Sequence, residues 1–129
     1  MPIDPPENQE RPEWYPRLLD ALERHACAGR LIAYATLADE AGIPRPHAIH
    51  KLTDALERLI SQDHADGRPL RAAVAVSKSR GGLPGPGFFQ HCRALGLYFG
   101  PDRGPQAETF HRLELDRLFV NRRDAGGDV

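Results

Sequence analysis

Apolar residues recur every three or four positions in several segments of the chain, which is the pattern of amphipathic helices. The pattern predicts a first helix over residues 13–28, which Gly29 should end, and a second, clearer helix over residues 47–62. The apolar stripe of that second helix consists of Ile49, Leu52, Leu56, Leu59 and Ile60. Further helices are predicted over residues 88–95 and 106–121.

A shorter helix is predicted over residues 36–41, between the two clearest ones. Thr36 is expected to be its N-cap, and Gly42 is expected to end it. Pro44 and Pro46 follow, and each disfavours helical backbone at the residue before it. The segment between the two helices is therefore predicted to be a tight turn.

Extended backbone is predicted over residues 30–34 and over residues 70–76, where Ala and Val favour a mostly buried strand. The segment 77–87 is rich in Gly and Pro and is expected to be a loop with defined turns. Phe88 and Phe89 follow it directly. Since two adjacent aromatic residues do not easily face one core, one of them is expected to be exposed or to cover the preceding helices.

Two helices of unequal length joined by a turn that contains Gly are typical of a helix-turn-helix, here over residues 32–60. The helix before it and the strand and Gly-rich loop after it complete the order of a winged helix. We therefore predict an α+β, mostly helical, winged-helix-like domain with a small β-sheet and an extra C-terminal helix. The chain of 129 residues has the size of one domain, predicted over residues 13–121, with a disordered lead-in over 1–12 and a flexible tail over 122–129.

Composition narrows the class of protein. An apolar content of 40% excludes wholesale disorder, and no apolar run approaches the roughly 20 residues that span a bilayer. The N-terminus lacks the basic and apolar regions of a secretory signal. Cys27 and Cys92 lie far apart in the sequence, and neither is part of a CxxC motif. We expect a cytoplasmic protein with free thiols and no membrane partner.

The net charge of −1 conceals an uneven distribution. Residues 45–93 contain eight Lys and Arg and four Asp and Glu, a balance of +4, while residues 1–44 have a balance of −4. In helix-turn-helix domains the start of the second helix enters the major groove, and a basic loop reaches the DNA backbone. The candidate DNA-binding residues by this reasoning are Arg45, His47, His50, Lys51, Lys78 and Arg80.

The same helix also contains acidic residues. Asp54 and Glu57 lie further along its exposed face and would repel phosphate if they were close to it. An ordinary solvated helix face with a plain connecting loop is therefore the alternative interpretation of these charges.

The run Ile32-Ala33-Tyr34-Ala35-Thr36-Leu37-Ala38, followed by Gly42-Ile43-Pro44, a long helix and Arg68-Pro69, resembles a known family. It is similar to the DNA-binding domain of the alkylguanine alkyltransferases and alkyltransferase-like proteins, over roughly residues 29–76. The resemblance implies a helix-turn-helix fold and makes Tyr34 the counterpart of a DNA-contacting tyrosine. That family carries a reactive cysteine, or a tryptophan in its place, after the proline. Residues 70–74 contain neither, so alkyl transfer is not expected here.

Other chemical motifs are incomplete. His47 and His50 share a helix face, but no third and fourth ligand stand at zinc spacing. His91 and Cys92 are adjacent and diverge on a helix, and the segment 81–87 lacks the Gly-Lys-Ser/Thr end of a phosphate-binding loop. We predict no catalytic residue, no metal and no cofactor.

Two functions are therefore expected from the sequence. The first is non-catalytic binding of double-stranded DNA, and the alternative is a winged-helix protein–protein interaction module that uses Leu83, Phe88 and Phe89. An apolar surface patch that includes Tyr98 and Phe99 would favour the second. An enzyme would need a pocket with converging polar groups, which the sequence does not indicate. The oligomeric state is left open.

Overall fold

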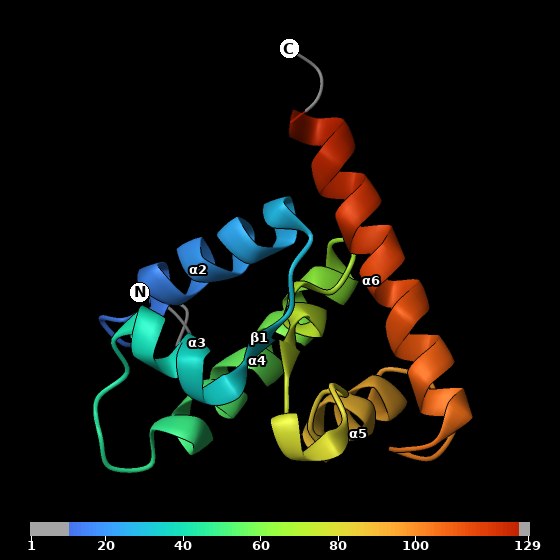
Figure 1. Cartoon of the computed structure of the whole chain (residues 1–129), viewed down its shortest axis with the longest axis horizontal. Helices are drawn as coiled ribbons and strands as arrows, with labels where there is room; N and C mark the ends of the chain where they lie inside the picture. Colours follow the sequence, from blue (N-terminus) through green and yellow to red (C-terminus); the bar gives the residue numbers. More distant parts are fainter. Residues whose placement is uncertain (1–10, 127–129) are drawn as a thin grey trace, which may run out of the picture.

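The computed structural model describes residues 11–126 and shows a mostly helical α+β fold (Figure 1). Residues 1–10 and 127–129, parts of the predicted lead-in and tail, lie outside the described residues. The elements are α2 (Tyr15–Ala28), β1 (Ile32–Ala33), α3 (Tyr34–Ala41), α4 (Ala48–Ala65), η1 (Arg71–Val74), β2 (Ala75–Val76), η2 (Lys78–Arg80), α5 (Pro86–Ala94) and α6 (Pro105–Gly126).

The predicted helices are confirmed, and so are the glycines that end two of them. Gly29 ends α2 and Gly42 ends α3, both with left-handed backbone, which glycine adopts without steric cost. The predicted N-cap at Thr36 is wrong. Helix α3 begins at Tyr34 with Ala33 as its N-cap and no side-chain cap, because the strand β1 leads into the helix without an intervening turn.

The predicted strand over residues 70–76 is largely wrong. Residues 71–74 form the short 3₁₀ helix η1, and only Ala75 and Val76 pair with Ile32 and Ala33, in a parallel ladder of two strands. Both segments are buried, so their apolar composition was compatible with either conformation. The helix α6 also runs past the predicted end at residue 121, to Gly126.

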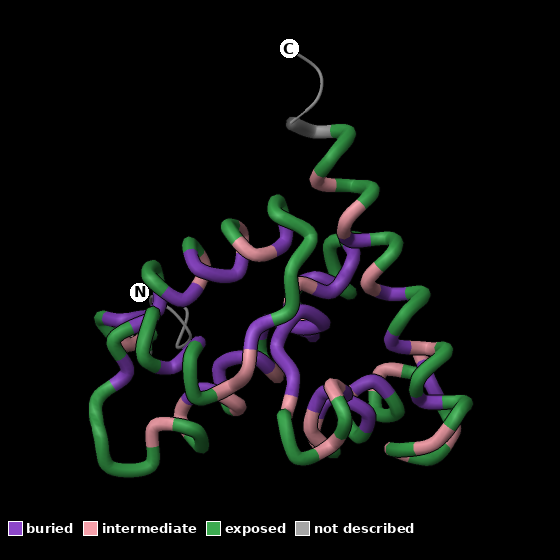
Figure 2. Tube along the Cα trace, viewed as in Figure 1, coloured by how far each residue is buried: buried purple, intermediate pink, exposed green. Residues whose placement is uncertain are grey.

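The core lies between α2, α3, α4 and η1, and α6 packs on η1 and α2 (Figure 2). Most of the predicted stripe of α4 is buried, but Ile49 at its start is 43% exposed, because the first turn of α4 projects beyond the core. Phe88 and Phe89 are both buried, so the predicted exposure of one ring is wrong, while Phe88 covers α4 as the other alternative expected. Both rings can be buried because α5 has neighbours on two sides: Phe88 lies near α4 and α6, and Phe89 lies near Tyr98. The two rings pack edge to face.

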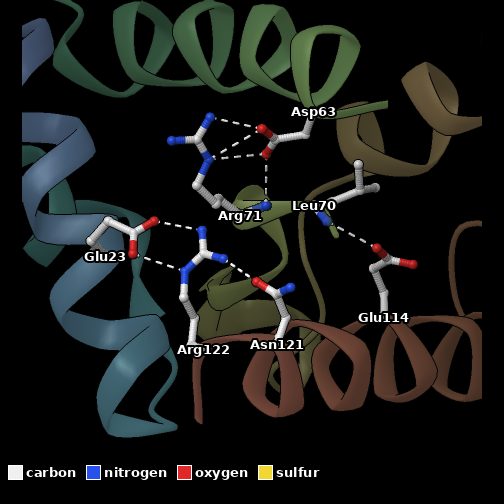
Figure 3. A network of polar contacts seen from close by, with 7 residues as sticks. All are labelled: Glu23, Asp63, Leu70, Arg71, Glu114, Asn121 and Arg122. Atoms are coloured by element: carbon white, nitrogen blue, oxygen red, sulfur yellow. Dashed lines mark hydrogen bonds and ion pairs between the residues drawn. The ribbon is translucent and has the colours of Figure 1, made fainter. Parts of the chain in front are cut away.

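A network of buried carboxylates holds the segment between α4 and β2 (Figure 3). Asp63, fully buried at the end of α4, accepts bonds from the guanidinium of Arg71 at 2.7 Å and from the Arg71 backbone amide at 3.0 Å. Glu114 of α6 accepts the adjacent amide of Leu70 at 2.9 Å. Arg122 joins α6 to Glu23 of α2 through a bidentate ion pair. The polar groups of this segment are thus satisfied from two different helices.

His111 of α6 is buried against the same segment. Its Nε2–H donates to the carbonyl of Ala73 at 2.8 Å, and its ring lies edge-on to Phe88. Burial lowers the pKa of His111 below the ordinary 6.5, although the bond to Ala73 opposes this shift. The neutral imidazole is therefore the form that the fold favours.

None of the helices in the described part of the chain combines the length and the hydropathy needed to cross a membrane. The two longest, α4 and α6, both carry charged side chains at close intervals.

Replacement of Asp63 tests the carboxylate network. The Asp63→Ala variant leaves the Arg71 guanidinium and amide buried without their partner, so we expect a loss of about 3–5 kcal/mol in the free energy of unfolding. Urea denaturation measures it. Asp54→Ala on the same helix is the control, because that side chain is 61% exposed and should cost about 0.5 kcal/mol or less. Equal losses in the two variants would contradict a structural role for Asp63.

The lowered pKa of His111 makes stability depend on pH. Below pH 6.5 the unfolded chain takes up a proton that the folded chain does not, so the free energy of unfolding should fall as the pH drops from 6.5 to the folded pKa. His111→Gln keeps a donor but does not titrate, and it should flatten this dependence. Urea midpoints at pH values on both sides of 6.5 check it. A variant as pH-sensitive as the wild type would show that other groups cause the effect.

Candidate nucleic-acid interface

The turn between α3 and α4 exposes basic side chains beside a helix start. Ile43 is buried and anchors the turn, whereas Arg45, His47 and His50 are exposed. The first turn of α4 contains no acidic residue. Since free backbone amides and the helix dipole make a helix N-terminus attractive to anions, the cations and the helix start favour the same type of ligand.

Lys51 has a structural contact within this turn. Its Nζ donates to the carbonyl of Pro44 at 3.0 Å, which closes the turn against the first turns of α4. One turn further along, the exposed carboxylate of Asp54 lies 3.5 Å from Nε2 of His50. Asp54 is therefore the first carboxylate after the basic start of α4.

Tyr34 joins the helix-turn-helix to the loop that precedes α5. We call residues 77–85 the basic loop. The Tyr34 hydroxyl accepts a hydrogen bond from the amide of Gly85 at 2.8 Å, and its ring lies against that glycine. Burial raises the pKa of Tyr34, while the Gly85 bond lowers it. The structure thus places this half-buried tyrosine, predicted to contact DNA, where it positions the basic loop.

Arg80 is not the loop cation available to phosphate that the sequence predicts, because its side chain is only 9% exposed. Its Nε donates to the carbonyl of Pro84 at 2.9 Å, and its Nη2 donates to the carbonyl of Asp102. Arg80 therefore ties the basic loop to the segment before α6, while Lys78 on η2 remains exposed.

These segments lie along one edge of the molecule. In Figure 1 the turn before α4, the first turn of α4 and the short helix η2 all lie at the lower edge of the view. The Tyr34–Gly85 bond and a small pocket of about 170 Å³, lined by residues of α3, α4 and the basic loop, show that the loop adjoins the helix-turn-helix. The exposed cations Arg45 and Lys78 and the half-buried Lys51 are brought to this edge from separate parts of the chain.

The surface predicted for a protein partner is not exposed. Leu83, Phe88 and Phe89 are buried, with exposed fractions of 6%, 5% and 3%, and Tyr98 is buried as well. Phe99 alone of the predicted apolar patch reaches solvent. The reason is the cluster of Phe88, Phe89, Tyr98 and Phe110, which fills the space between α5 and α6.

One polar contact was not foreseen from the sequence. Ser61 of α4 and Nε2 of His91 on α5 lie 2.6 Å apart, in a cleft between the start of α2, α4 and α5. A Ser–His contact is one requirement for an activated nucleophile, and a carboxylate that orients the histidine is another. No bond from the other ring nitrogen of His91 to a carboxylate is found among residues 11–126. The pair joins two helices.

Cysteine and metal chemistry find little support within the described residues. Cys27 is exposed and Cys92 is buried, and both are free thiols. Burial raises the pKa of Cys92 to about 12, which removes its thiolate at neutral pH. Between residues 11 and 126, no three His, Cys, Asp or Glu side chains gather as a metal site would require.

Comparison of the chain with protein-family models, with curated proteins and with solved structures finds no match. The resemblance to alkyltransferase-like domains therefore rests on the sequence motif of residues 29–76 alone. At the position after Pro69, where that family carries its reactive residue, the side chain of Leu70 is 2% exposed and its amide is bound by Glu114. This position offers no nucleophile.

Variants of the basic loop separate structural from exposed cations. Arg80→Ala leaves the carbonyls of Pro84 and Asp102 without their donor, so we expect the free energy of unfolding to fall by about 1–3 kcal/mol. Lys78→Ala, two residues away on the exposed side, should change it by about 0.5 kcal/mol or less. Urea unfolding of both proteins measures the difference. A stability loss for Lys78→Ala as large as that for Arg80→Ala would contradict the assignment.

Proposed function

We propose that this chain is a non-catalytic protein that binds double-stranded DNA through a winged-helix-like arrangement. In this arrangement α4 is the helix presented to the major groove, and the basic loop contacts the adjacent backbone. The small parallel sheet and the helix η2 are proposed to serve as its wing.

The observation that carries the proposal is that the start of α4 and the helix η2 of the basic loop lie at the same edge of the molecule (Figure 1). Arg45 and Lys78 are exposed there, and the first turn of α4 has no acidic residue. The Tyr34–Gly85 bond ties the basic loop to the start of α3, the first helix of the helix-turn-helix. Duplex DNA presents a dense row of phosphates, which cations bind with release of counterions. A fixed edge with cations at two places is suited to that surface.

The side chains divide into contacting and positioning residues. Arg45 and Lys78 are proposed to bind phosphate, and His47 and His50 are proposed to face base edges from the first turn of α4. Lys51 closes the turn through Pro44 and has further donors for phosphate.

Tyr34 and Arg80 position the basic loop and are not counted among the phosphate contacts. Asp54 is proposed to mark the end of the DNA-contacting part of α4. Its carboxylate would repel phosphate, so only the start of the helix enters the groove.

Protein–protein interaction was the alternative function, and no observation favours it as it was predicted. Its three candidate residues are buried, and Phe88 and Phe89 belong to the aromatic cluster between α5 and α6. The exposed cations of the α4 edge also have no role in that hypothesis.

The salt dependence of duplex binding tests the proposal. The wild type should bind random-sequence duplex at about 50 mM salt, with an affinity that falls steeply as salt is raised. The double variant Arg45→Ala/Lys78→Ala removes two proposed phosphate contacts, so the slope of log affinity against log salt should become shallower by about 1.8. Fluorescence anisotropy with labelled duplex gives both quantities.

A matched variant controls for net charge. Arg112→Ala/Arg123→Ala also removes two exposed cations, but from α6, and should leave the slope unchanged. Failure of the wild type to bind duplex at about 50 mM salt would refute the proposal. An equal change of slope in the two double variants would show that binding depends on net charge and not on the α4 edge.

A further inference from the structure

Phe99 is the most exposed large apolar side chain in the described part of the chain. It is 68% exposed, compared with 43–56% for Leu31, Ile49, Leu113 and Val120. A single apolar residue at the surface is common in proteins and needs no explanation by itself. Phe99 is different because its loop is tightly held and because cations surround it.

The loop of residues 96–104, the Phe99 loop, is fixed on both sides of the exposed ring. Before it, Tyr98 stacks on Phe110 with a centroid separation of 4.6 Å, and its hydroxyl donates to the carbonyl of Pro101 at 2.7 Å. After it, the carbonyl of Gly100 accepts a bond from Arg93 at 2.8 Å. A Cβ at residue 100 would lie 2.5 Å from the Tyr98 hydroxyl oxygen. The backbone around Phe99 is therefore held closely, and the exposure of its ring is built into the fold.

Arg80 links the Phe99 loop to the basic loop, since its guanidinium donates to the carbonyls of Asp102 and Pro84. Figure 1 shows the segment before α6 at the same lower edge of the view as η2 and the start of α4. The charged residues in and beside the Phe99 loop are mostly basic. Arg93 and Arg103 are exposed, and Asp102, the one acidic residue of the Phe99 loop, lies within 4.0 Å of both Arg80 and Arg103.

We propose that Phe99 is an apolar wedge that contacts the bases of bound duplex DNA and unstacks a base step, while Arg93 and Arg103 bind the flanking phosphates. This rests on the proposed function and adds to it a contact outside the helix-turn-helix. Proteins that bend DNA insert rigid apolar side chains in this way, next to cations that hold the backbone. Binding through a mobile loop would cost conformational entropy, and the held backbone on both sides of Phe99 reduces that cost. The charge around Phe99 favours nucleic acid over an apolar protein partner.

The test uses duplexes in which single adenines are replaced by aminopurine, whose fluorescence rises when a base is unstacked. Binding of the wild type should raise the fluorescence at one position of the bound site. Phe99→Ala should bind about tenfold more weakly, give no rise, and keep the wild-type salt slope because it removes no charge. Phe99→Leu keeps an apolar wedge and should retain the rise.

Leu113→Ala is the matched control, because it removes another exposed apolar side chain, from α6. It should bind duplex with the affinity of the wild type and give the same rise in aminopurine fluorescence. A Phe99→Ala protein with wild-type affinity and fluorescence would overturn the wedge. So would a Phe99→Ala protein with wild-type DNA binding but altered sedimentation, which would assign Phe99 to contact with a second copy. Absence of any duplex binding by the wild type would instead refute the proposed function itself.

Discussion

Two buried carboxylates hold the short segment on which the rest of the fold depends. Asp63 from α4 and Glu114 from α6 accept the backbone amides of Arg71 and Leu70, two consecutive residues (Figure 3). Buried amides need acceptors and buried carboxylates need donors, so each group satisfies the other. The bonds fix the start of η1, and η1 leads directly into β2, whose parallel pairing with β1 places the start of α3.

The same two strands connect the core to the exposed edge. The strand β1 ends at Ala33, directly before Tyr34, and β2 leads into the basic loop, so the sheet brings the segments of both partners of the Tyr34–Gly85 bond together. Arg80 then extends this connection to the Phe99 loop. Cations that are far apart in the sequence are in this way carried on one framework, which is the physical basis for proposing a single DNA-contacting edge. Aromatic packing between α5 and α6 further stabilises this arrangement.

The sequence predicted what is determined locally. Apolar spacing and the glycines at 29 and 42 gave the helices and their ends, because these depend on neighbouring residues. The prediction of a strand failed at η1, because Ala and Val suit any buried segment. The conformation there depends on carboxylates of α4 and α6, which lie outside the segment itself. The prediction also failed at Arg80, because backbone carbonyls are its partners and carry no signature in the sequence. The exposed cations Arg45 and Lys78 were predictable from loop and helix-start chemistry; their convergence on one edge was not.

The start of α4 and the basic loop are proposed to form one surface for duplex DNA. A titration of the isotopically labelled protein with a short duplex, followed by amide NMR, tests it most directly. We expect the largest shifts on residues 43–51 and 77–82 and small shifts along the outer face of α6. Shifts concentrated on α6, or no shifts at low salt, would contradict it.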